Sequence, residues 1–271
     1  MKTINIYIFA GLLFLLSACQ EVIEVPLDNT NPKLVVEGAI TNQPGPYYVK
    51  LSQTGDFYST APAPKVTDAV VTISDDAGNS EVLTHLSDQP GTYATSSLQG
   101  ETGRTYTLTI VHEGQNYQAQ SKLLPVTNID KLEVRFVPES PTKDEGYYIY
   151  FFAKEPQGET NYYRFMVYEN DSLYNSINDL LVSNDDFIKG DIENLELGYA
   201  FQLNDEVKLE MHSISKEVYD YYIGLINIYN NDGGLFSPPP VNPPSNISNG
   251  ALGVFRASSV VSQTVTITGE E

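Results

Sequence analysis

Apolar and polar residues alternate through a series of short runs from residue 33 to about residue 125. In "TYTLTIV", Tyr106, Leu108 and Ile110 fall on one side of an extended backbone and three threonines fall on the other. A period of two is typical of a half-buried antiparallel strand. Turn sequences rich in Gly, Asp and Asn separate the runs. About seven short strands predict a β-sandwich of immunoglobulin-like or transthyretin-like topology over residues 33–125.

The second part of the chain, residues 126–271, also favours strands. The run "GYYIYFFAKE" is aromatic or aliphatic on both of its faces, which indicates a strand covered on both sides. "NYYRFMVYEN" and "DEVKLEMHSIS" alternate as further strands, and the stretch after residue 250 adds one or two more. The fold class predicted is therefore mainly β, with an N-terminal immunoglobulin-like β-sandwich followed by a β-rich C-terminal domain that contains one helix.

That amphipathic helix is predicted over residues 215–231. Ser215 stands at the N-cap position, and Glu217 stands in the first turn, where the helix dipole favours an acid. The sequence from Asn231 to Gly234 should end the helix. Its apolar face is expected to pack on the second sheet. The residues of that face are Val218, Tyr221, Tyr222, Leu225, Ile228 and Tyr229.

A proline-rich segment follows the helix. Prolines fix the backbone dihedral φ and lack an amide donor, so this segment should be stiff and extended. A stiff segment loses little entropy on docking, which makes it the best candidate interaction loop in the sequence. The alternative is a strap that only covers the sheets. The prolines concerned are Pro238, Pro239, Pro240, Pro243 and Pro244.

The first 18 residues read as an export signal, because Lys2 precedes an apolar run that is too short to span a bilayer. The sequence from Leu16 to Cys19 resembles the lipobox of bacterial lipoproteins, in which the cysteine is lipidated and becomes the new N-terminus. Cys19 is the only cysteine of the chain, so no internal disulfide can form. Residues 19–32 read as a lipidated tether. The alternative is an ordinary secretory signal that happens to end near a cysteine.

Composition narrows the range of partners. The chain carries 35 acidic and 15 basic residues, with a formal net charge of −20. A surface this acidic repels phosphate backbones, so nucleic acid is not an expected partner. It also repels anionic lipid, which leaves the acyl anchor on Cys19 as the expected membrane contact.

Four stretches of the chain are "PKLVVEGAITNQPGPYYVKLSQT", "VTDAVVTISDDAG", "GTYATSSLQGETGRTYTLTI" and "NISNGALGVFRASSV". Together, and in this order, they resemble a family of Bacteroidota outer-membrane lipoproteins catalogued as domain of unknown function family 4249. The resemblance extends over essentially all of the chain after the signal, and it implies an outer-membrane lipoprotein. Exposure at the cell surface is expected from Glu21 and Glu24, because acidic residues just after the lipidated cysteine resemble the surface-export signal of Bacteroidota lipoproteins. It also implies a context near TonB-dependent transporters of the SusC type. No binding residues are established for the family, so none carry over.

Side chains capable of chemistry are scattered. His85, His112 and His212 have no second ligand at a metal-binding spacing, and the last two are expected to face solvent from strands. The adjacent acids at 75–76 and 185–186 lie in turn-like contexts. No nucleophile elbow, phosphate loop or dinucleotide loop occurs in the sequence. We therefore predict no catalytic residues, no metal and no cofactor.

Three other features have ordinary structural explanations. The asparagine and aspartate runs at 184–186 and 230–232 offer oxygen ligands for calcium, but turn chemistry explains both. The tyrosine clusters at 147–152 and 162–168 could form a carbohydrate or peptide platform, but core packing is the simpler interpretation. Arg164 lies in an apolar strand and would need a carboxylate or carbonyl partner if buried.

The expected function is that of a non-enzymatic surface lipoprotein. It would act as an accessory binding partner of a TonB-dependent transporter in nutrient capture. The rival expectation is a structural or adhesion component of an envelope complex, which would have protein partners but no small ligand. The sequence does not identify a ligand.

Overall fold

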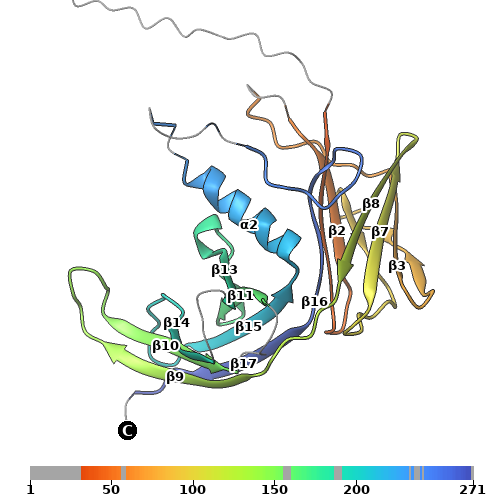
Figure 1. Ribbon diagram of the computed structural model, residues 1–271. Coiled ribbons are helices and arrows are strands. Elements are labelled where there is room, and N and C mark those ends of the chain that lie inside the picture. Colours follow the sequence, from red (N-terminus) through yellow and green to blue (C-terminus); the bar gives the residue numbers. More distant parts are fainter. Residues whose placement is uncertain are drawn as a thin grey trace, which may run out of the picture. The chain divides into compact units, whose positions relative to one another are not determined.

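The computed structural model describes residues 32–55, 59–154, 160–185, 191–231, 233–234, 239 and 241–269. Their architecture is mainly β, in several sheets, with α2 (Lys216–Tyr229) as the α-helix of the described residues (Figure 1). This confirms the predicted fold class. The predicted signal peptide, Cys19 and nearly all of the tether lie outside the described residues.

The first sandwich consists of two sheets. One has the strand order β16-β1-β2-β6-β5 and the other has the order β4-β3-β7-β8. The strands of the first sheet are β1 (Leu34–Thr41), β2 (Tyr48–Gln53), β5 (Thr84–His85), β6 (Thr92–Ala94) and β16 (Leu252–Ser258). Those of the second are β3 (Val70–Asp75), β4 (Ser80–Val82), β7 (Thr105–His112) and β8 (Gln115–Lys122).

The alternation in β7 explains how the two sheets come together. Tyr106, Leu108 and Ile110 are fully buried between the sheets, as the period of two predicts, while the threonines between them are partly exposed. They pack with inward residues of the opposite sheet, such as Val49 and Phe255, in one continuous core. Burial of apolar surface of this kind contributes about 25 cal/mol per Å².

The second group of sheets encloses a separate core that includes Ile149, Phe165 and Met211. One sheet has the order β14-β10-β9, and the other has the order β12-β11-β15-β17 with β13 also paired to β11. Their strands are β9 (Ile129–Val137), β10 (Gly146–Ala153), β11 (Tyr162–Glu169), β12 (Ser172–Leu173), β13 (Leu181–Asn184), β14 (Ile192–Glu196), β15 (Glu206–Ile214) and β17 (Val260–Thr266), and the 3₁₀ turn η2 covers Ile177–Asp179.

The consecutive strands β16 and β17 near the C-terminus connect the two sandwiches. Strand β16 pairs in parallel with β1 in the first sandwich, and β17, directly after it, pairs antiparallel with β15 in the second. At the crossing point, Ser213 Oγ donates to the Leu124 carbonyl oxygen at 2.6 Å, and the Val260 amide donates to Asn42 Oδ1 at 2.7 Å. The first sandwich is thus completed by a strand from the end of the chain. The division at residue 125 stays a prediction.

The two faces of strand β10 are covered in different ways. Ile149 and Phe151 point into the core, whereas Tyr150 and Phe152 on the other face are only partly buried. Cations from β9 lie over this outer face, with Arg135 Cζ 4.2 Å from the Tyr150 ring centroid. Charged side chains, rather than another sheet, shield these rings.

The carboxylate of Glu81 in β4 fixes the connection between β6 and β7. It accepts hydrogen bonds from the amides of Ser96, Ser97 and Leu98, the last at 2.6 Å. Burial alone would raise the pKa of Glu81, but these donors outweigh it and lower the pKa to about 2.

We expect Glu81→Gln to destabilise the protein by about 2 kcal/mol, because an amide cannot accept all of these charge-assisted bonds. Chemical denaturation at pH 7 measures the loss. The exposed Glu193 provides the control, since Glu193→Gln should leave the unfolding midpoint unchanged. Equal stability of the Glu81 and Glu193 variants would contradict the role given to Glu81.

Candidate functional site

The helix α2 begins at Lys216 as predicted, and Ser215 occupies the N-cap position. Its side chain makes no capping hydrogen bond, so the expected hydroxyl cap is absent, although Glu217 stands in the first turn. Val218 and Tyr222 are buried and pack with Ile214 of β15 and Val254 of β16. The helix therefore contacts the second group of sheets, as predicted, and also a strand of the first sheet.

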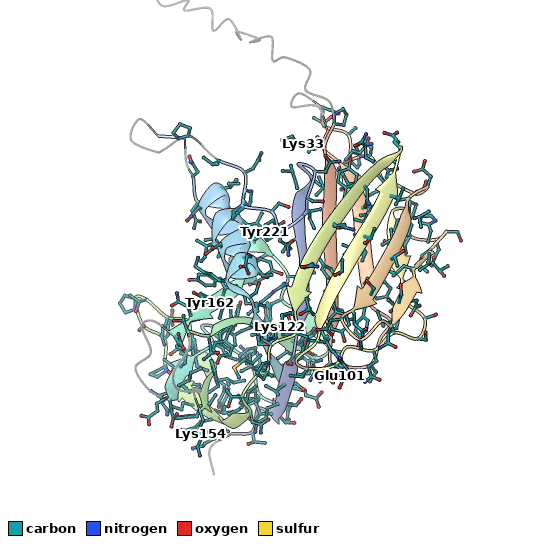
Figure 2. The ribbon with its side chains drawn as sticks, turned by 45° about the vertical axis from the view of Figure 1, so that its right-hand side comes forward. Lys33, Glu101, Lys122, Lys154, Tyr162 and Tyr221 are labelled. Atoms are coloured by element: carbon teal, nitrogen blue, oxygen red, sulfur yellow. The ribbon has the colours of Figure 1, made fainter. Side chains whose placement is uncertain are left out.

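The two ends of the helix differ in burial. Toward the C-terminal end, Ile228 and Tyr229 are 37% and 56% exposed, although both continue the apolar spacing. Tyr221 lies on the side of α2 that faces β16 (Figure 2). The last turns of α2 thus present apolar and amide side chains that the sheets do not cover.

The proline-rich segment lies beside these last turns. At Gly224, a Cβ atom would stand 3.0 Å from Pro243 Cα and 3.2 Å from Pro244 Cδ. Only glycine allows the helix backbone to approach the segment this closely without a shift. The segment is fixed further along, because Asn246 Oδ1 accepts from the Phe255 amide at 3.0 Å and Asn246 Nδ2 donates to the Phe255 carbonyl oxygen at 2.7 Å.

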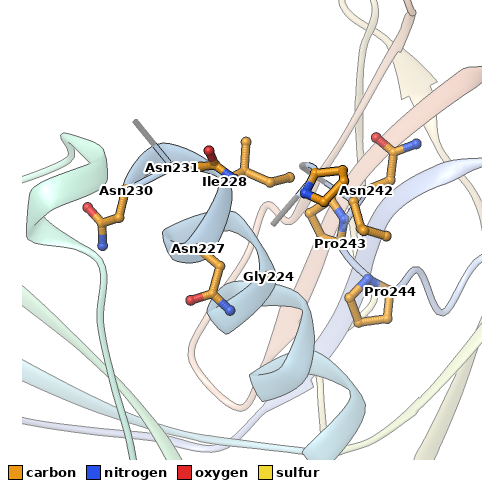
Figure 3. A pocket seen from close by; sticks show the side chains of 10 residues that line it. Gly224, Asn227, Ile228, Asn230, Asn231, Asn242, Pro243 and Pro244 are labelled. Carbon is orange, nitrogen blue, oxygen red and sulfur yellow. The ribbon is translucent and has the colours of Figure 1, made fainter. Parts of the chain in front are cut away.

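A pocket of about 690 Å³ lies between the helix and the segment (Figure 3). Ile228 points from the helix toward the segment in this view. None of the described residues that line the pocket is ionisable. They are Gly224, Asn227, Ile228, Asn230, Asn231, Pro239, Val241, Asn242, Pro243 and Pro244.

The chemistry of this lining favours binding. Each asparagine amide offers two donors and an acceptor without a charge, and the prolines, Ile228 and Val241 offer apolar surface. Neutral hydroxyl or peptide groups fit such a surface, whereas acid–base catalysis requires a titratable group near the reacting atoms. We call this pocket the α2–proline pocket.

Three of the predicted loop prolines, Pro239, Pro243 and Pro244, line the pocket. Pro238 and Pro240 lie outside the described residues. The helix half of the pocket was not predicted. Two signals could have revealed it: a glycine in the interior of an amphipathic helix, and four asparagines, three before the proline run and one within it.

The expectation that His112 and His212 face solvent is wrong. They are only 8% and 4% exposed. The polar face of β15 is covered by α2 and β16, which the alternation within one strand cannot reveal. His112 Nδ1 lies 3.2 Å from Asp68 Oδ1, and His212 Nε2 lies 3.2 Å from Glu210 Oε2.

The remaining candidate residues have structural surroundings. Asp75 Oδ1 accepts from the amides of Ala77 and Asn79, which fits the predicted turn. Of the second acidic pair, Asp186 lies outside the described residues. Over the described ranges, no group of three His, Cys, Asp or Glu side chains could hold a metal ion.

Among the described residues, Arg164 has neither of the expected partners. Its Nη1 donates to the Tyr222 hydroxyl at 2.7 Å, and its Cζ lies 4.8 Å from the centroid of the Tyr222 ring. A neutral tyrosine of α2 thus takes the place of the predicted carboxylate or carbonyl.

Comparison with known proteins identifies a family. The family described as "Domain of unknown function (DUF4249)" matches residues 20–264. The chain belongs to this family. No curated protein matches it. Within the described residues of this DUF4249 protein, no helix has the length and apolar character needed to cross a membrane.

Proposed function

We propose that this DUF4249 protein is a non-enzymatic lipoprotein, anchored through Cys19 to the outer membrane and exposed at the cell surface. It acts as an accessory of a TonB-dependent transporter of the SusC type, and the α2–proline pocket supplies its contact with a nutrient or with the transporter.

The observation that carries this proposal is the neutral lining of the α2–proline pocket in a chain with a net charge of −20. Prolines on one side and a helix on the other hold the contact groups before a ligand arrives. A preorganised site loses less conformational entropy on binding, so a larger part of the interaction energy appears as affinity.

The sequence around Cys19 supports the anchor. The export signal ends in the lipobox-like sequence, and the family match begins at residue 20, directly after the cysteine. Several acyl chains on one residue give stable anchoring where a single chain is marginal, because each buried CH₂ contributes about 0.8 kcal/mol.

The rival role, a structural or adhesion component of an envelope complex, has one observation in its favour. Val241, which lines the pocket, is 76% exposed, and Ile228, which also lines it, is 37% exposed. Exposed apolar side chains that lie together mark protein contacts.

Affinity purification from mildly solubilised outer membranes, followed by mass spectrometry, tests the proposal. We expect a TonB-dependent transporter in about equal amount with the tagged protein, and loss of membrane association in Cys19→Ala. Recovery of assembly or surface-layer proteins without a transporter would support the rival role and refute the accessory role.

A graded pair of variants at Gly224 tests the pocket. Alanine adds one methyl group near Pro243, and its better helix propensity, about 1 kcal/mol, offsets the crowding, so Gly224→Ala should stay near the wild type. Gly224→Leu adds a side chain that must displace the proline segment, so transporter recovery should fall at least about fivefold while the protein stays folded. Circular dichroism checks the fold. Undiminished recovery with Gly224→Leu would show that the pocket is not the contact.

A further inference from the structure

The four arginines of the chain fall into two classes. Arg104 and Arg135 are partly exposed and paired with carboxylates, Arg104 with Glu101 at 3.3 Å and Arg135 with Glu133 at 2.7 Å. Arg164 and Arg256 have no carboxylate within ion-pair distance among the described residues. In a chain with 35 acidic residues, a lack of available acids does not explain this difference.

Arg164 and Arg256 lie near each other beneath α2. Arg164 in β11 is directly opposite His212 in β15, and Arg256 Nη1 in β16 lies 3.3 Å from His212 Nδ1. His212 therefore stands between the two guanidinium groups. Tyr222 of α2 covers Arg164 and accepts a hydrogen bond from it.

His212 does not compensate their charge. Burial lowers its pKa to about 4, so the imidazole is neutral at neutral pH. Its Nε2 carries the proton and donates to Glu210, which leaves Nδ1 to accept from Arg256. The Glu210 carboxylate also bonds to Lys208 Nζ at 2.9 Å and to the Tyr168 hydroxyl at 3.3 Å.

Both arginines show the consequences of an uncompensated charge. Arg164 Nε is buried and has no hydrogen-bond acceptor among the described residues. Burial lowers the pKa of Arg256, and the field of Arg164 lowers it further, while the field of Glu37 in β1 acts in the opposite direction. Buried donors and charges are normally satisfied, so the Arg164 Nε group, with the Arg256 cation near it, points to an acceptor that the described residues do not supply.

We propose that Arg164 and Arg256, together with Tyr222, bind a small oxyanion, the carboxylate or phosphate group of a ligand. A guanidinium presents planar paired donors that match two oxygens of either group. The site is separate from the α2–proline pocket, since it lies under Tyr222 and not beside the last turns of α2. It would orient one acidic group of a ligand or partner.

The test uses the full-length protein purified in detergent, with inorganic phosphate or acetate as the probe. Sodium chloride at matched ionic strength serves as the reference. We expect calorimetry to show saturable binding of phosphate or acetate. We also expect a higher melting temperature in either probe than in sodium chloride. The stronger probe distinguishes a phosphate ligand from a carboxylate ligand.

The matched variants are Arg164→Gln, Arg256→Gln and Arg135→Gln. The first two should weaken binding at least about tenfold, whereas Arg135→Gln should not, although Arg135 also lies over a tyrosine ring. Arg164→Lys keeps the charge but loses the paired donors, so it should bind more weakly than wild type even if Arg256→Gln fails to fold.

Three results would overturn the site. They are no stabilisation beyond chloride, equal loss with Arg135→Gln, and full binding in both Arg164 variants. Because Gly224→Leu alters only the α2–proline pocket, it should leave oxyanion binding unchanged, and the two proposals can fail independently.

Discussion

Replacement of Gly253 by alanine should prevent folding of the chain or destabilise it by more than about 4 kcal/mol. Gly253 lies in β16 with φ of +100°, a backbone conformation that residues with a side chain rarely adopt. It is paired in register with Val36 of β1, and a Cβ atom would stand 1.9 Å from the Val36 carbonyl oxygen. Neither backbone can yield, because each is held within the same sheet.

Gly78 provides the matched control. It has a similar φ of +93°, but a Cβ atom there would meet nothing within 4 Å. Gly78→Ala should therefore cost only the backbone strain, about 1–2 kcal/mol. Urea denaturation, with expression in soluble form as a first screen, compares the two variants. Similar losses would show that the strained φ alone, and not the close approach of β1 and β16, makes Gly253 necessary.

The local pattern of the sequence predicts the strands well because burial follows it. The alternation in β7, the hairpin turn at Asp75–Asn79 and the start of α2 all depend on residues close together in the chain. The same pattern predicts the sandwich core, since the inward set of each strand is apolar. Such features are determined by short-range geometry and by the hydrophobic effect.

The pairing of β1 with β16 has no such local signal. Val36 and Gly253 are far apart in the sequence, and a parallel pair needs no turn that could mark it. The error about His212 has the same origin, because its surroundings come from α2 and β16 rather than from β15. Only the assembled sheets show that a polar strand face is an interior surface.

The candidate site was half predictable for a related reason. The sequence predicts both the proline run and the helix, and the stiffness of the proline run follows from its composition. Their contact depends on Gly224, and the sequence alone does not show which segment packs against this glycine. A glycine inside a helix indicates a close approach but does not say which segment approaches.

Acidification from pH 7 to pH 4 should remove about 3 kcal/mol of stability through His212 alone. Burial lowers the pKa of this imidazole from 6.5 to about 4, against the pull of Glu210 and with the repulsion of Arg256 and Arg164. Between these pH values His212 becomes protonated in the unfolded state but stays neutral in the folded state. Stability is therefore complete above about pH 6.5 and falls until about pH 4.

The carboxylate beside it extends the loss to lower pH. Burial alone would raise the pKa of Glu210, but hydrogen bonds with His212 and Lys208 outweigh it and lower the pKa to about 2. The unfolded chain protonates this group near pH 4.5, so its contribution is present above that pH and is lost as the pH falls toward 2. The two groups thus act in consecutive windows.

Chemical denaturation at pH 7, 5.5 and 4.5 separates the histidine from the rest. His212→Gln should be less stable than wild type at pH 7, because the bonds to Glu210 and Arg256 change, but its stability should vary much less between pH 7 and pH 4.5. Gly78→Ala, a destabilised variant that leaves His212 in place, should keep the full wild-type slope. If the stability of His212→Gln depended on pH as strongly as that of wild type, His212 would not be the group whose pKa is lowered by folding. The assignment of a neutral imidazole between the two arginines would then be wrong.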